Sequence, residues 1–372
     1  MKMKVLLLFY LVISITIFGQ ETKIANQDLS VFFPRPKIDK RIELLSIVFR
    51  LAGNREYNSE DFKVYTQDIH KYFDKFKDHP VISFASKLRM EKGVSYDAVM
   101  KMAFHIGQPP LFAPKVKFND DIPERRWGKD NAMKFIELLQ DFYKVTDFDK
   151  FYNEHAEIYT IAEEKFLPVY GALKIDWYNQ YYGLKPNGSF NVIICLGNGG
   201  SNYGGKIVFE DNSEDAFAIM GTWSIDSMNK PFYKIPNYLP TLIHEFNHSY
   251  VNPLVDKFSN QLENSGKIIF APIENNMKRQ AYGNWKTMIC ESIVRASVIR
   301  YMLKYDSYKA AKGQMISEIG NGFYWMQGLV NLLYEYEHNR TKYTTLESFM
   351  PQIIQFYDKI AKESEAMYEI KQ

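Results

Sequence analysis

The sequence of 372 residues contains little cysteine and no excess of charge of either sign. It has two cysteines, Cys195 and Cys290, which lie far apart in the sequence. This excludes a small fold that is stabilised mainly by disulfides. Both lie in apolar segments, so the two cysteines could form one disulfide or remain as buried free thiols. Lys+Arg number 46 against Asp+Glu 44, without a basic block. We therefore expect no nucleic-acid partner and no electrostatic binding to an anionic membrane.

Long apolar runs are also scarce, and the most apolar segment is at the N-terminus. Residues 5–18 form a weakly polar to apolar run that follows Lys2 and Lys4 and precedes Gly19. This run is shorter than the roughly 20 residues that span a bilayer. The pattern predicts a signal peptide over residues 1–19, so we expect export to the periplasm or the cell exterior, with no stable membrane anchor after cleavage. An uncleaved N-terminal anchor is the alternative.

Nucleotide-binding motifs are absent, although residues 197–206 are rich in glycine. A phosphate loop needs Ser or Thr after Gly-Lys, and Ile207 follows Lys206 instead. Ser201 and Asn202 break the glycine spacing of a dinucleotide-binding loop. We expect a flexible connection between two strands, which could close over a substrate or lie along it as an added strand. A plain exposed hairpin is the alternative.

The periodicity of the apolar residues changes twice along the chain. Helical spacing predicts a helical N-terminal lobe over residues 20–185. Short runs rich in β-branched and aromatic residues predict a small antiparallel sheet over residues 190–221. Helical spacing resumes near residue 239, with breaks expected near Pro253, Pro272 and Gly313. The order predicts a mostly helical α+β protein whose second region, residues 186–372, places the sheet beside a central helix.

That central helix, expected over residues 239–251, contains two histidines with the spacing of metal ligands. His244 and His248 are four residues apart, so both imidazoles lie on one helix face, where one zinc ion can bind them at about 2.0–2.1 Å. Glu245 lies beside the first histidine and can reach a metal-bound water. Asn252 and Pro253 predict that the helix ends soon after His248.

A zinc site of this kind needs a third protein ligand, and Glu291 is the best candidate. It lies on the apolar stripe of a helix expected over residues 285–305, where a carboxylate needs a cation or hydrogen-bond donors. Arg295, one turn further on, could brace it, and a plain Glu291–Arg295 ion pair is the alternative. Glu263 and Glu274 are weaker candidates because we expect both in loops.

The residues after His248 exclude one type of zinc site. In zinc sites with His-Glu-x-x-His whose third ligand is a downstream histidine, Gly and His would occupy the positions of Val251 and Leu254, so this type is excluded. Tyr282 is a weaker catalytic candidate, because a phenol can donate a hydrogen bond to developing negative charge.

The motif His244-Glu245-Phe-Asn-His248, together with Glu291, resembles the gluzincin group of the zincin metallopeptidases. The stretch HEFNHSYVNP, with RIELLSIVFRLAG from Arg41 and SYDAVM from Ser95, is similar to a family of exported bacterial proteins defined as a domain of unknown function and regarded as metallopeptidase-like.

This resemblance implies a zincin-like fold and one zinc ion per chain. His244, His248 and Glu291 would bind the ion and Glu245 would be the general base. The chain departs from familiar gluzincins in having Cys290, rather than Asn, before the glutamate, and in a longer gap after His248.

The sequence therefore predicts an exported zinc-dependent hydrolase, in first place a metallopeptidase acting on a peptide or protein substrate. An amidase acting on cell-wall or other non-protein amides would use the same attack on an amide carbonyl. The alternative from another class is a non-catalytic exported module that binds peptides or glycans and holds a structural or vestigial metal.

Overall fold

The computed structural model describes residues 32–183 and 188–368, without the side chains of residues 367 and 368. The predicted signal peptide, residues 1–19, lies outside the described residues. None of the helices within the described ranges is both long and apolar enough to cross a membrane.

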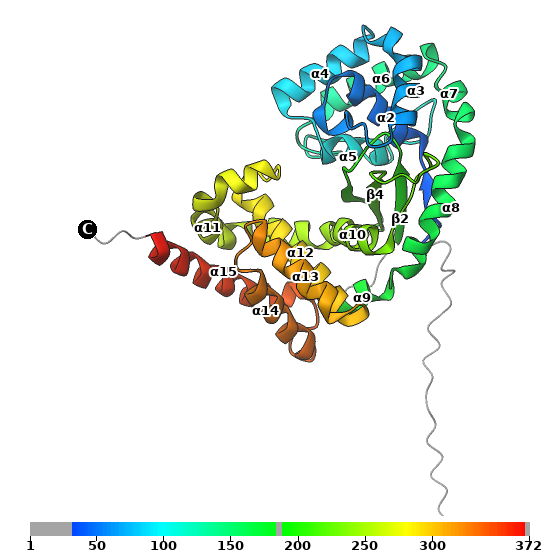
Figure 1. Ribbon diagram of the computed structural model, residues 1–372. Helices are drawn as coiled ribbons and strands as arrows, with labels where there is room; N and C mark the ends of the chain where they lie inside the picture. The colour runs from blue at the N-terminus through cyan, green and yellow to red at the C-terminus, as the bar shows by residue number, and fades with distance from the viewer. Residues whose placement is uncertain (1–31, 184–187, 369–372) are drawn as a thin grey trace, which may run out of the picture.

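The first part of the chain is helical, as its periodicity predicts. Its helices form the upper lobe in Figure 1, and α8 and α9 lead down from it. The elements are α2 (Lys40–Leu51), η1 (Arg55–Tyr57), α3 (Lys63–Phe73), η2 (Asp74–Phe76), α4 (Pro80–Lys92), α5 (Asp97–His105), α6 (Lys129–Val145), α7 (Phe148–Glu154), α8 (Ala156–Ala172) and α9 (Asp176–Tyr182).

The sheet has four strands in the order β1-β2-β4-β3, and it is mixed, so the predicted antiparallel sheet is wrong. The strands are β1 (Lys37–Ile38), β2 (Gly188–Cys195), β3 (Tyr203–Val208) and β4 (Glu214–Gly221). β1 and β4 both pair with β2 in parallel, and only β3 and β4 form an antiparallel pair. The short apolar runs predicted where the strands lie. The glycine-rich connection after β2 leads to β3 at the edge of the sheet, and β4 then lies between β2 and β3. Pairing between strands distant in sequence cannot be read from periodicity.

Helices cover both faces of the sheet. On one face, Phe217 of β4 stacks on Phe104 of α5, with ring centroids 4.6 Å apart. On the other, Phe190 of β2 packs against Phe246 of α10, with ring centroids 5.1 Å apart. The two cysteines are both free, with Cys195 buried, which answers the question of a disulfide.

The second half of the chain ends in six helices: α10 (Ile235–Lys257), α11 (Ser259–Arg279), α12 (Trp285–Tyr305), α13 (Tyr308–Gly320), α14 (Met326–His338) and α15 (Leu346–Tyr368). The range predicted for α12 is confirmed. The predicted end of the central helix is wrong, because α10 continues through Pro253 to Lys257. Glu263 and Glu274 lie inside helix α11, not in loops. The breaks expected near Pro272 and Gly313 are wrong as well, because Pro272 lies within α11 and Gly313 within α13.

Burial explains why Pro253 does not end α10. A proline inside a helix removes one hydrogen bond and costs roughly 3 kcal/mol. α10 lies between the sheet and α12, where it buries Leu242, Phe246, Val251 and Val255 completely. The packing of these buried side chains outweighs the tendency of Pro253 to end the helix. The mostly helical α+β architecture is confirmed.

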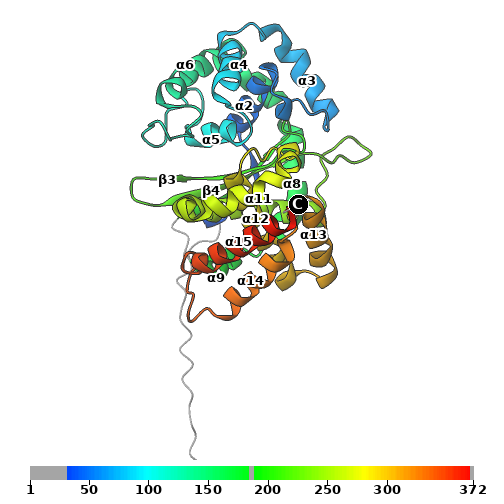
Figure 2. The ribbon, with the colours of Figure 1, turned by 90° about the vertical axis from the view of Figure 1, so that its left-hand side faces the viewer.

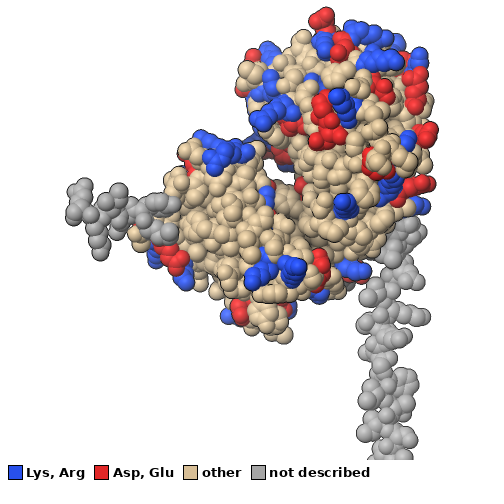
Figure 3. Space-filling view, in the orientation of Figure 1, with Lys and Arg blue, Asp and Glu red and all other residues tan. Residues whose placement is uncertain are grey.

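The molecule has a hollow between its two lobes. Figure 3 shows it between the upper lobe and the lobe that carries α11, and Figure 2 shows the same arrangement from the side, with β3 and β4 between the lobes. Helices α10 and α12 lie next to this hollow in Figure 1.

Candidate metal centre

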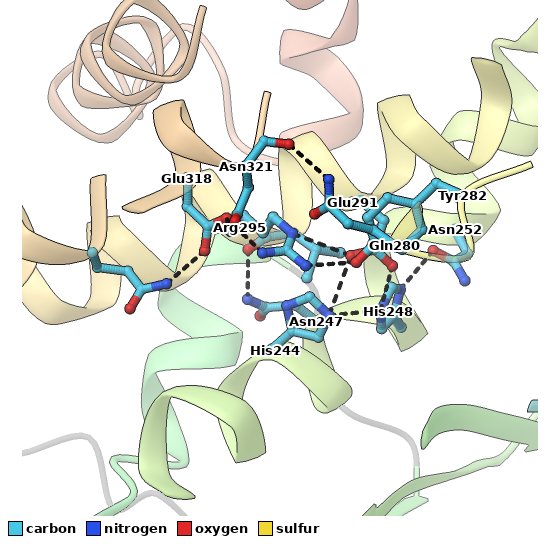
Figure 4. A network of polar contacts seen from close by, with 12 residues as sticks. His244, Asn247, His248, Asn252, Gln280, Tyr282, Glu291, Arg295, Glu318 and Asn321 are labelled. Atoms are coloured by element: carbon cyan, nitrogen blue, oxygen red, sulfur yellow. Dashed lines mark hydrogen bonds and ion pairs between the residues drawn. The ribbon is translucent and has the colours of Figure 1, made fainter. Parts of the chain in front are cut away.

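Helices α10 and α12 bring His244, His248 and Glu291 together. The two helices pack side by side, and the buried Asn247 of α10 donates a hydrogen bond of 3.3 Å from Nδ2 to the carbonyl of Val294 of α12. Figure 4 shows both imidazoles pointing toward the carboxylate. The three side chains that the sequence singled out as ligands therefore meet at one point.

The donor atoms have the spacing that a tetrahedral ion requires. His244 Nε2 and His248 Nε2 are 3.1 Å apart. Glu291 Oε2 lies 3.4 Å from His244 Nε2, and Glu291 Oε1 lies 3.4 Å from His248 Nε2. An ion bound tetrahedrally at 2.0–2.1 Å places its ligand atoms about 3.3 Å apart. The three donors fit a single zinc-sized ion, and among the described residues no fourth His, Cys, Asp or Glu joins the group.

Asn252 fixes the proton of His248 at the nitrogen that faces away from the centre. Its Oδ1 lies 3.1 Å from His248 Nδ1, which donates to it and leaves the Nε2 lone pair for a metal. This role of Asn252 was not predicted from the sequence, because Pro253 placed Asn252 at the expected end of the helix. The signal was present, since Asn252 follows His248 by four residues on one helix face.

His244 is held in the neutral form that binds metals. Burial lowers the pKa of its imidazole well below the ordinary value, and the neighbouring His248 and Arg295 lower it further.

Arg295 contacts the third candidate ligand, Glu291. Its Nε donates to Glu291 Oε2 at 3.3 Å, and its Nη2 donates to the hydroxyl of Tyr282 at 2.6 Å. The expected Glu291–Arg295 ion pair is thus present together with the three-ligand geometry. Burial raises the pKa of the Tyr282 phenol, Glu291 raises it further, and Arg295 partly opposes both. Tyr282 is accordingly a hydrogen-bond donor at neutral pH.

Glu245 is 6% exposed and borders the centre without being one of the three grouped donors. Burial raises the pKa of its carboxyl well above the ordinary value, and Glu291 raises it further. Arg295 and the backbone amide of Gly204 act in the opposite direction.

The glycine-rich segment reaches the centre through Gly204. A Cβ atom at Gly204 would lie 2.0 Å from the carbonyl oxygen of Glu245, so only glycine allows β3 to lie against α10 here. From Tyr203 onward this segment is strand, not the flexible connection that the sequence suggested. β3 is an edge strand of the sheet.

Comparison with known proteins identifies the family. The chain belongs to the family described as Domain of unknown function (DUF4932), whose model matches residues 36–356. No curated protein and no solved structure matches the chain. The expected membership in a family of this kind is confirmed, and the resemblance to zincins stays a prediction.

Proposed function

We propose that the protein is an exported zinc-dependent hydrolase, and specifically a metallopeptidase. The observation that carries this proposal is the grouping of His244, His248 and Glu291, whose nearest nitrogen and oxygen donors lie 3.1–3.4 Å apart. Two imidazoles and one carboxylate, with a fourth position that takes water or substrate, form a donor set of catalytic zinc sites. Structural zinc sites close all four positions with protein ligands.

When bound, zinc supplies Lewis-acid chemistry, because it lowers the pKa of a coordinated water to about 7 and polarises a carbonyl oxygen. Around it, His244 and His248 each present an Nε2 lone pair, and Glu291 supplies the negative charge. Arg295 Nε donates to Glu291 Oε2 at 3.3 Å, on the side of the carboxylate away from Asn252 and within the same network (Figure 4).

Glu245 is suited to proton transfer. It is buried beside the centre, and burial raises the pKa of its carboxyl, which makes the carboxylate a stronger proton acceptor than an exposed glutamate. In the proposed reaction Glu245 accepts the proton of the attacking water and delivers it to the leaving amine. Tyr282 would donate to the negative charge that develops on the carbonyl oxygen.

The surroundings favour an extended peptide as substrate. β3 is an edge strand that packs against α10 at Glu245, and an edge strand can pair with an extended chain through backbone hydrogen bonds. The hollow between the lobes offers access to this region (Figure 3). Pairing of this kind favours a peptide over a small amide.

The test compares wild type with Glu245→Gln, using zinc content by elemental mass spectrometry and hydrolysis of a mixed peptide library. We expect about one zinc per chain in both proteins, and loss of most of the turnover in Glu245→Gln. Glu263→Gln, an exposed change in α11, is the matched control and should behave as wild type. Equal hydrolysis by wild type and Glu245→Gln would refute the mechanism and leave the non-catalytic binding module as the better description.

A further inference from the structure

A second buried carboxylate, Glu318, lies behind the candidate metal centre. It belongs to α13 and is 2% exposed. Gln314 Nε2 donates to its Oε1 at 2.5 Å, and Asn321 Nδ2 donates to its Oε2 at 3.1 Å. Glu318 is not one of the three grouped metal donors. These donors satisfy the buried carboxylate and hold it in one orientation.

Its ionic partner is Arg295, which lies between the two carboxylates (Figure 4). Arg295 Nη1 is 2.5 Å from Glu318 Oε2, whereas its Nε is 3.3 Å from Glu291 Oε2. The rings of Tyr282 and Phe323 lie 5.7 and 5.3 Å from the guanidinium carbon and restrict its movement. The shorter contact is thus the one that points away from the metal ligands.

The charges of Arg295 and Glu318 affect how strongly Glu291 can bind a cation. A guanidinium beside Glu291 repels a divalent cation and competes with it for the carboxylate lone pairs. Glu318 opposes both effects, because its charge offsets that of Arg295 and its position holds the guanidinium at the longer distance. Without the Glu318 charge, Glu291 would be the remaining carboxylate in contact with Arg295 among the described residues.

We propose that Glu318 is a positioning residue that sets the affinity of the centre for its metal, by keeping Arg295 from neutralising Glu291. This inference rests on the proposed function, since it assumes that His244, His248 and Glu291 bind zinc. Residues behind metal ligands commonly change affinity by roughly 10- to 100-fold.

The experiment measures zinc affinity by competition with a chromophoric chelator for wild type, Glu318→Gln and Glu337→Gln. Glu337 is a matched control, because it pairs with Arg300 of the same helix α12 and is not part of the metal centre. We expect Glu318→Gln to bind zinc at least about 10-fold more weakly than wild type. Glu337→Gln should bind it as wild type does.

A double variant separates the proposed role from a purely structural one. If Glu318 acts through the charge of Arg295, adding Arg295→Gln to Glu318→Gln should recover most of the lost affinity. If Glu318 only held α13 in place, the second change would recover nothing, and the proposal would be overturned. Should Glu318→Gln lack the circular dichroism spectrum of wild type, Glu318→Asp, whose shorter side chain withdraws the carboxylate from Arg295, takes its place with the same expected loss.

The outcomes distinguish the two proposals. Wild type that binds no zinc would refute the metal centre and, with it, the role of Glu318. Wild type that binds zinc, together with unchanged affinity in the Glu318 variant, would overturn only the role of Glu318.

Discussion

Replacing Gly204 with alanine tests whether the edge strand β3 lies against α10, the helix that contains His244 and His248. The added Cβ would lie 2.0 Å from the carbonyl oxygen and 2.7 Å from the carbonyl carbon of Glu245. Side-chain carbons do not approach other heavy atoms closer than about 3 Å, so β3 and α10 would have to separate by about 1 Å. Both partners are backbone, and neither can rotate away.

Overpacking of a buried contact typically costs roughly 1–3 kcal/mol. We expect the upper part of this range for Gly204→Ala, because the clash involves two packed elements and not the end of a side chain. The free energy of unfolding should be measured by urea denaturation of the metal-free protein, which makes the result independent of the proposed chemistry. If the protein is a hydrolase, turnover should fall as well, because Glu245 moves with α10.

Two other glycines serve as controls. Gly205→Ala places its Cβ 2.8 Å from the ring of Phe104, on the opposite face of the sheet, and a ring can shift at a smaller cost. Gly313→Ala, in helix α13, meets nothing within 4 Å and should stabilise the protein by roughly 0.5–1 kcal/mol. An unchanged urea midpoint in Gly204→Ala would refute the close packing of β3 on α10.

Two further predictions concern single side chains. Burial lowers the pKa of His105 from its ordinary value of 6.5 to about 4, although its hydrogen bond to the Lys101 carbonyl acts in the opposite direction. Between these values the unfolded chain binds more protons than the folded one, so stability is fully present above pH 6.5 and is lost as the pH falls toward 4. His105→Asn should therefore remove roughly 2 kcal/mol from the difference in unfolding free energy between pH 7 and pH 5; the same difference in both proteins would exclude His105 as its source. Asn252→Ala removes the acceptor of His248 Nδ1 and should weaken zinc binding by about 10-fold or more, measured by chelator competition, whereas Asn252→Asp should preserve it.

The grouping of the three candidate ligands was predictable because helical spacing is a local property. His244 and His248 share a face through the geometry of one helix, and Glu291 was identifiable because a carboxylate on an apolar stripe needs a partner. Asn252 was missed although its spacing was visible, since the following Pro253 suggested the end of the helix. Glu318 carries no local signal, because its partner Arg295 lies on another helix.

The sequence by itself determined the mostly helical α+β class, the range of α12, and the three side chains that meet as a candidate metal site. These follow from periodicity and residue type, which act over one or two helical turns. Only the tertiary structure decided the mixed strand order, the continuation of α10 through Pro253, and the placement of Gly204 and Glu318 around the centre. Each of these depends on contacts between elements distant in sequence, whose packing energy outweighs local preference.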